Sequence, residues 1–425
     1  VRELIRDNWH TTVQHCTADT ATLIGLPYPY TVPTAGAMFR EMYYWDTFFT
    51  NEGLVRDGHP ELAKGNTDNL LYMVRRFGKV YNGSRTYYEA RSQTPYLSMI
   101  VDRIYRLTGD KQWLADAYQT LKEEYGFWMR ERLTPTGLNR YGSSASDALV
   151  DEFLVTGGKR LGTDLFDKGY TPERLHKLGL DFVAEAESGW DFNPRYDRRC
   201  TDFCPLDLNA NLFMYEVNFA RFAQELGRTD EIREWIAKAE LRRARILQYC
   251  YDPEAKQFYD YDYVNGRRSD VLSGAVFALL YSGAVPREYA GDIVQALIPL
   301  RHRRLRGQAL RLPLPVVLSQ HVAPGLLLCG DGTGPLRIRQ RGRTHCRQMD
   351  ESGHRIVQDD GQPLGKVQRG NGNDRCQQRI RDARDAGLDR RHLHLSGRLS
   401  GWGDAARPAA LGIHELLTTN KITTL

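Results

Sequence analysis

Asp191 lies between two aromatic residues, Trp190 and Phe192, in a polar and aromatic stretch of the chain. A carboxyl group beside two such rings would be partly desolvated, which favours its protonated form. A protonated carboxylic acid next to a substrate can donate a proton to a leaving group, as general acid catalysis requires. The alternative role for an aspartate in such a loop is helix capping. Asp191 is therefore the first candidate for acid–base chemistry.

Long loops rich in Trp, Tyr, Asp, Arg and Asn surround this candidate in the sequence. We expect such loops over residues 28–50, 79–95, 136–165 and 185–209. Long loops in a compact domain are usually functional. Aromatic faces suit the apolar C–H faces of sugars, while planar polar groups satisfy sugar hydroxyls. The composition of these loops predicts a carbohydrate-binding site.

Helices must position these loops, because apolar residues between 60 and 300 recur with helical rather than alternating spacing. Apolar stripes run through residues 97–107, 113–128, 208–222, 232–239, 271–281 and 289–297. Breaks at 109–110 and 227–230 separate consecutive stripes, which indicates antiparallel helix pairs. Strand-like alternation is scarce, so the pattern predicts an all-α fold.

The sequence also resembles a known family. The segment from Met38 to Phe49, MFREMYYWDTFF, resembles the first signature of the trehalases, which are inverting glycosidases with an (α/α)6-barrel fold. Further matches follow in the family's order at residues 82–88 (NGSRTYY), 91–93 (RSQ), 187–192 (ESGWDF) and 206–210 (LDLNA). The resemblance covers about residues 20–300. It implies an (α/α)6 barrel, a toroid of helical hairpins, that is incomplete at the C-terminus.

The resemblance also implies roles for individual residues. It makes Asp191 the general acid in the hydrolysis of trehalose to glucose with inversion, without a metal or an organic cofactor. It places the following residues at the sugar: Phe39, Trp45, Asp46, Asn82, Arg91 and Trp190. Core packing is the alternative for the two tryptophans, and a structural ion pair is the alternative for Arg91.

Position 38 departs from the family pattern. Met38 stands where the resemblance would place an arginine against substrate hydroxyls. The Pro-Glu-Ser pattern expected after residues 138–141 is also missing. These departures leave two alternatives to trehalose hydrolysis. One is a related (α/α)-barrel glycosidase acting on another glycoside, and the other is a catalytically inactive sugar-binding protein.

Residues 301–425 differ in kind from the rest of the chain. They contain 22 Lys and Arg against 11 Asp and Glu, whereas residues 1–300 contain 36 against 42. Of all Phe, Trp and Tyr residues, Trp402 alone lies beyond residue 300. An inverting glycosidase needs a second carboxylate as general base. The resemblance implies a Glu near the C-terminus for this role, but the motifs that accompany it are absent from this segment.

We interpret residues 301–425 as translated in the wrong reading frame. Shifted readings of the segments 348–354, 365–368 and 386–393 permit trehalase-like motifs in the expected order. This interpretation predicts a catalytic domain over 1–300 and an anomalous basic tail without a native fold over 301–425. A nucleic-acid-binding tail is the alternative, and the interspersed Asp residues and the lack of aromatic side chains disfavour it.

Bulk features exclude further classes of protein. No apolar run reaches the ~20 residues that a membrane span requires. Seven scattered cysteines argue against a disulfide framework and favour a reducing compartment such as the cytoplasm. Cys200 and Cys204 lack the second pair that a zinc site needs. The chain begins without an initiator Met or an apolar signal core, as a truncated N-terminus would. The expected partner is a small disaccharide rather than nucleic acid or a membrane, and the sequence leaves the oligomeric state open.

Overall fold

The computed structural model describes residues 2–36, 39–162 and 164–295, which all belong to one compact unit. Met38 and the basic tail over 301–425 lie outside the described residues, and so does the end of the apolar stripe over 289–297. In the part of the chain that the structure describes, no helix is long and apolar enough to cross a membrane.

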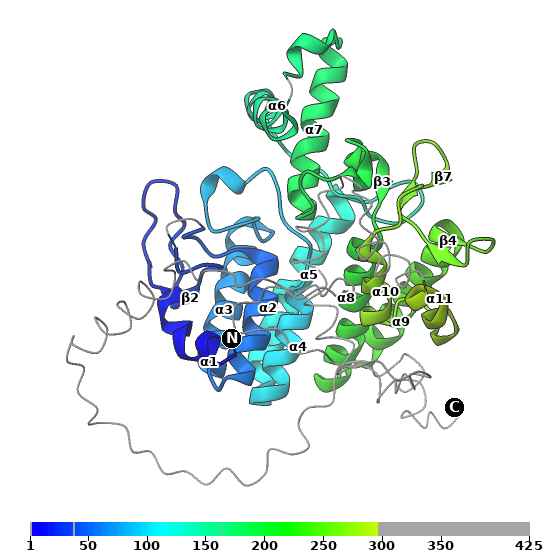
Figure 1. Cartoon of the computed structure of the whole chain (residues 1–425). Helices are drawn as coiled ribbons and strands as arrows, with labels where there is room; N and C mark the ends of the chain where they lie inside the picture. The colour runs from blue at the N-terminus through cyan, green and yellow to red at the C-terminus, as the bar shows by residue number, and fades with distance from the viewer. Residues whose placement is uncertain (1, 37–38, 163, 296–425) are drawn as a thin grey trace, which may run out of the picture. The chain divides into compact units, whose positions relative to one another are not determined.

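The described residues are mainly helical, which confirms the all-α class (Figure 1). The α-helices are α1 (Arg2–Asn8), α2 (Tyr44–Arg56), α3 (Pro60–Phe77), α4 (Leu97–Thr108), α5 (Lys111–Glu131), α6 (Asp147–Leu161), α7 (Pro172–Ser188), α8 (Leu206–Glu225), α9 (Thr229–Arg245), α10 (Phe277–Ser282) and α11 (Ala290–Gln295). Short 3-10 turns are η1 (Trp9–Thr12), η2 (Thr86–Tyr88), η3 (Phe166–Lys168), η4 (Pro194–Tyr196), η5 (Cys200–Asp202), η7 (Gly274–Val276) and η8 (Arg287–Tyr289), and η6 (Ile246–Cys250) is a π-helical turn.

Short antiparallel strands connect the helices. They are β1 (Val13–Gln14), β2 (Tyr30–Thr31), β3 (Phe203–Cys204), β4 (Tyr251–Asp252), β5 (Gln257–Phe258), β6 (Tyr261–Asp262) and β7 (Arg267–Arg268). Strand β1 pairs with β2, β4 pairs with β5, and β6 lies between β3 and β7. Each strand has two residues, so these ladders fasten loops and do not form a core sheet.

Consecutive helices pack as pairs: α2 with α3, α4 with α5, α6 with α7, and α8 with α9. The α4–α5 connection shows how the sequence sets a boundary. Gly109 ends α4 in the left-handed conformation, with φ of 66°, and the Asp110 side chain then caps α5 by accepting from the Trp113 amide. Such caps satisfy amide groups that have no partner within the helix.

The core is dominated by α8, which is buried along most of its length between α4, α5, α9 and α10. Aromatic rings fill the contact between α5, α8 and α9, where Tyr125 and Phe219 meet Trp235 edge-on or tilted. The buried carboxyl of Glu124 accepts hydrogen bonds from the hydroxyls of Tyr44 and Tyr215. This contact ties α2, α5 and α8 together.

The structure corrects two loop expectations, because α6 occupies much of the segment 136–165 and α2 begins at Tyr44, inside the segment 28–50. The Ser146 hydroxyl caps α6 by accepting from the Leu149 amide. A Cβ at Gly157 would lie 2.7 Å from the Phe182 ring, so the glycine allows α6 to pack closely on α7. The two helices bury a small core of their own, formed by Val150, Leu154, Leu165, Leu178 and Phe182. They project from the other helices (Figure 1).

Candidate active site

The C-terminal end of α7 lies next to the N-terminal end of α2. Gly189 ends α7 with φ of 74°, and a Cβ added there would lie 2.8 Å from the ring of Trp45. The Trp45 amide donates to Oε1 of Gln93, at 2.9 Å. The motif segments 38–49, 91–93 and 187–192 therefore meet here, and Trp45 lies beside the segment that carries Asp191.

Asn82 connects these segments from within. Its side-chain amide donates to the carbonyls of Ala186, at 3.1 Å, and Ser92, at 3.3 Å. Its own carbonyl accepts from the amide of Tyr44, at 3.1 Å. Asn82 is buried, so its side chain connects the loop 79–95 to α7 within the protein interior.

Glu187 is a second buried residue that joins the loops. It lies in the motif segment 187–192, but the sequence alone did not reveal its role. Its carboxylate makes paired bonds of 2.9 and 3.0 Å with Arg132. It also accepts from the amides of Ser92 and Gly142, at 2.9 and 2.7 Å. Paired bonds to arginine and two amide donors satisfy a buried carboxylate, which would otherwise be costly to desolvate. Glu187 therefore fastens the loops 79–95 and 136–146 to α7.

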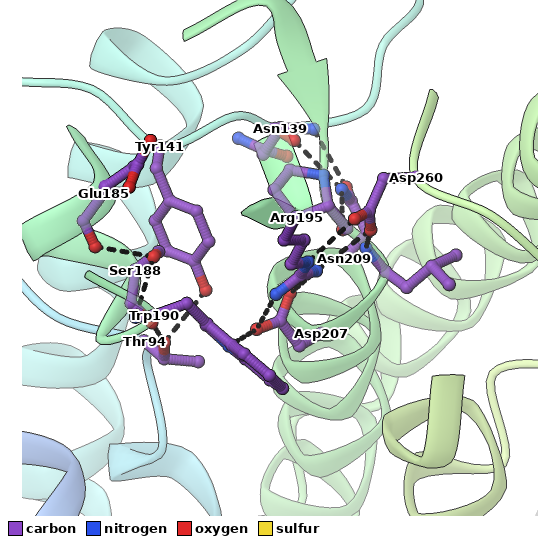
Figure 2. A network of polar contacts seen from close by, with 12 residues as sticks. Thr94, Asn139, Tyr141, Glu185, Ser188, Trp190, Arg195, Asp207, Asn209 and Asp260 are labelled. Carbon is purple, nitrogen blue, oxygen red and sulfur yellow. Dashed lines mark hydrogen bonds and ion pairs between the residues drawn. The ribbon is translucent and has the colours of Figure 1, made fainter. Parts of the chain in front are cut away.

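The Trp190 side chain points into the protein, toward α8 (Figure 2). Its indole Nε1 donates to Asp207 Oδ2 at 2.9 Å, and the Arg195 guanidinium lies 4.7 Å from the ring centroid. Arg195 in turn forms ion pairs of 2.7 Å with both Asp207 and Asp260. This buried network fits the core-packing alternative for Trp190.

Asp191 keeps contact with solvent and pairs with a residue of α6 rather than α8. Its side chain is 30% exposed, and Oδ2 lies 2.8 Å from the guanidinium of Arg160 on α6. The expected enclosure by neighbouring rings is not seen, because Trp190 turns toward α8 while Phe192 packs against Phe182, with 4.9 Å between centroids. Arg160 escaped the sequence analysis because it belongs to the segment expected to be a loop.

Arg91 lies between two rings. Its guanidinium is 4.7 Å from the Tyr88 centroid and 4.9 Å from the centroid of Phe153 on α6. The residue is only 9% exposed, and burial lowers its pKa, while Asp191 is among the groups that raise it. Among the described residues, the buried Nε has no hydrogen-bond partner and the guanidinium forms no ion pair. Arg91 therefore keeps donor capacity that a ligand could use.

Phe39 belongs to a group of aromatic residues that extends through Tyr43 and Tyr88 to Arg91. The ring is 48% exposed and contacts Tyr43 edge-on at 5.7 Å between centroids. The Tyr43 hydroxyl lies 2.8 Å from that of Tyr88 and donates to Glu41 at 2.6 Å. Glu41, which also lies within the first motif, thus orients the tyrosine that supports Phe39.

Two more carboxyl groups near these segments are held away from water. Burial raises the pKa of Asp46 on α2 to about 6. Burial and the nearby charges of Asp181 and Asp191 raise the pKa of Glu185 on α7 well above its usual range. Across residues 2–36, 39–162 and 164–295, no group of three or more His, Cys, Asp or Glu side chains could hold a metal ion.

Comparison with known proteins identifies the family. The trehalase family model matches residues 2–308. The neutral trehalase of Saccharomyces cerevisiae is similar to this chain with a TM-score of 0.56 and 26% identity, over 70% of this chain and 61% of the yeast protein. The chain thus spans less than two thirds of that protein's length.

Two solved structures from Thermus thermophilus show weaker similarity. An uncharacterised conserved protein matches with a TM-score of 0.46 and 17% identity, over 69% of this chain and 74% of that protein. A mannosylglycerate hydrolase matches with a TM-score of 0.42 and 17% identity, over 63% and 72% of the respective chains. Because the family model covers well over half of the sequence, and a solved trehalase shares the fold, this chain belongs to the trehalase family and has the expected all-α, (α/α)6-barrel class of fold.

Proposed function

We propose that this chain carries the acid half of an inverting α,α-trehalase-like glycoside hydrolase, with Asp191 as the general acid. The carrying observation is a contrast among neighbouring carboxylates. All three pair with arginines, but Glu187 and Asp207 are buried together with their partners, whereas Asp191, just after α7, and its partner Arg160 are both exposed to solvent. A proton donor must reach the glycosidic oxygen, and Asp191 has that access.

In the proposed reaction, protonated Asp191 gives its proton to the oxygen that links the two sugars. The bond from that oxygen to C1 breaks, and a water attacks C1 from the opposite face. Attack on that face inverts the configuration at C1, and the attacking water loses a proton to a general base. The second sugar leaves as an alcohol, and Asp191 recovers a proton from solvent.

The other expected site residues divide into binding and supporting groups. The unpaired donor of Arg91 suits a sugar hydroxyl, and the exposed Phe39 ring suits an apolar sugar face. Trp45 lies beside Gly189 at the start of α2, and Asp46 follows it in the same turn. Asn82 and Trp190 are buried, and their hydrogen bonds fix the segments that carry these groups. We expect a neutral disaccharide to bind among them.

We propose further that the general base is missing from this chain. Inversion requires a second carboxylate roughly 6.5–9.5 Å from the acid. The domain over 1–300 supplies Asp191, whereas the segment 301–425, which lies outside the described residues, lacks the motifs that accompany the family's base. General base catalysis typically contributes ~10²–10⁴-fold. The chain as printed should therefore show negligible hydrolysis of trehalose.

Glucose release from trehalose tests the proposal. The chain as printed is compared with a version whose codons after residue 300 are read in the shifted frame, each with and without Asp191→Asn. We expect turnover only in the frame-restored chain with Asp191, with β-glucose as the first product of the attacked ring by NMR. Turnover by the chain as printed would contradict the missing base, and full activity of the frame-restored Asp191→Asn variant would contradict the acid.

The same proteins separate the alternatives. Met38, where the resemblance expects an arginine, favours testing other glycosides beside trehalose. A frame-restored chain that turns over a glycosylglycerate or an oligosaccharide but not trehalose is a related glycosidase. Saturable sugar binding without turnover, together with an uninterrupted natural reading frame, would identify a sugar-binding protein instead.

A further inference from the structure

Helix α6 extends two side chains into the candidate active site, although it packs chiefly against α7. Phe153 lies on the guanidinium of Arg91, at 4.9 Å from the ring centroid. Arg160, about two turns later on the same face of the helix, pairs with Asp191 at 2.8 Å. The two charged groups that we assign to the sugar are therefore both contacted from α6.

Arg160 is placed by two contacts and held weakly. Besides the pair with Asp191, its guanidinium lies 5.0 Å from the centroid of Phe192, which itself packs on α7. The Arg160 side chain is 56% exposed. Ion pairs between exposed side chains contribute only ~0–1 kcal/mol. The contact fixes a direction for the Asp191 carboxylate, and an incoming ligand could displace it at little cost.

The pair also conflicts with the chemistry proposed for Asp191. A carboxylate oxygen that accepts from a guanidinium is an acceptor, whereas a general acid must carry a proton and donate it. A protonated carboxyl group can donate from one oxygen and still accept at the other, but a neighbouring guanidinium favours the ionised form. Substrate binding that moves Arg160 away from Asp191 would therefore favour the protonated form that the proposed reaction needs.

We propose that Arg160 is a positioning residue that holds Asp191 in the empty site and transfers to an oxygen of the bound glycoside. This inference rests on the proposed function. On binding, one proton moves from solvent to the Asp191 carboxylate, and the guanidinium keeps its charge and donates to the sugar instead of to Asp191. Binding of a neutral glycoside should thus be coupled to proton uptake.

Other charged groups near Asp191 must be separated from this effect. Arg91 approaches from the loop 79–95, Arg160 from α6 and buried Glu185 from α7. Asp191→Asn removes the proposed proton acceptor, and Glu185→Gln removes a buried carboxyl group that interacts with Asp191. Lys159→Gln is the matched control for Arg160→Gln, because Lys159 is an exposed neighbour on α6 with the same charge.

Calorimetric titration of the chain as printed with trehalose, in buffers of different ionisation enthalpy, measures both affinity and proton uptake. We expect uptake approaching one proton over a limited interval of pH, which we call the coupled range. Within it, the affinity for trehalose should fall about tenfold for each unit by which the pH rises. In Arg160→Gln, this pH range should become narrower at its acidic end. The substitution removes the arginine partner of Asp191 in the empty site, whereas in the bound site that partner has already moved to the sugar. Arg160→Lys should restore most of the coupled pH range. The controls Lys159→Gln and Glu185→Gln should leave that range unchanged, and Asp191→Asn should abolish proton uptake.

The outcomes distinguish the two levels of the proposal. If Arg160→Gln leaves the pH range unchanged or shifts both ends together, the arginine does not move away on binding and the inference is wrong, while the sugar site stands. If the chain shows no saturable trehalose binding, the proposed sugar site itself is overturned.

Discussion

Trp190 and Asp191 are adjacent in sequence but belong to two regions with opposite electrostatic designs. On the inner side, Trp190 joins a buried network in which Arg195 pairs with Asp207 and Asp260 (Figure 2). On the outer side, the ion-pair partner of Asp191 among the described residues is the exposed Arg160. Buried charges must have all their bonds satisfied, whereas an exposed carboxylate can exchange partners. The inner region therefore gives rigidity, and the outer region keeps a group available for chemistry.

The strongest way to break this comparison is to remove a cation from the inner region. Arg132→Met would leave Glu187 buried without its paired partner. Such a loss costs about 3–5 kcal/mol. Urea unfolding should show it, whereas Arg130→Met, at an exposed arginine two residues earlier, should change stability little. Equal effects of the two substitutions would mean that burial does not set the difference.

A buried carboxyl without an arginine should show itself through pH. Burial raises the pKa of Glu124 to about 7, from 4.5. The folded state therefore binds the proton more tightly, so stability is full below pH 4.5 and declines as pH rises through 7, by about 3 kcal/mol in all. Glu124→Gln should flatten this decline in unfolding measured from pH 4.5 to 8. Glu123→Gln, at an exposed neighbour, should keep it.

A milder change within the inner network should have a smaller effect. Trp190→Phe removes the indole donor to Asp207, which still accepts from Arg195. We expect a loss of roughly 1–2 kcal/mol from the missing bond and the smaller ring. Thermal unfolding measures it, and a loss as large as that of Arg132→Met would show that the ring, rather than the ion pairs, holds the segment.

The smallest effect on stability is expected on the outer side. Arg160→Gln breaks an exposed ion pair and should change the free energy of unfolding by less than about 1 kcal/mol. Urea unfolding beside Lys159→Gln checks this. If the free energy of unfolding fell by several kcal/mol, the pair between Arg160 and Asp191 would stabilise the fold as much as the inner network does. The contrast between the two regions would then be wrong.

Local patterns were sufficient to predict several of the helices, whereas the resemblance to the trehalases implied that the motifs share one site. The stripes over 97–107 and 113–128 correspond to α4 and α5, because each buries one face and ends at a recognisable cap. Helix α6 was missed because its contact with α7 depends on Gly157, whose meaning emerges only when Phe182 packs against it.

Pairings between distant residues could not be predicted in the same way. The bond between Arg132 and Glu187 joins two ends of the site across many residues of chain, and neither residue has a distinctive local pattern. The different partners of Trp190 and Asp191 depend on how the chain leaves Gly189, which spacing does not encode. Arg160 was not predicted because it lies on α6, which was itself expected to be a loop.

Gly189 has a consequence for how such a site can vary. Its φ of 74° disfavours any side chain, and the Trp45 ring occupies the space that a Cβ would need. Positions 45 and 189 are thus coupled in sequence space: a smaller residue at 45 would remove the clash at 189 but not the backbone penalty. In a library that varies both positions, we expect Gly189 to persist almost everywhere, and its rare replacements to occur only beside a small residue at 45.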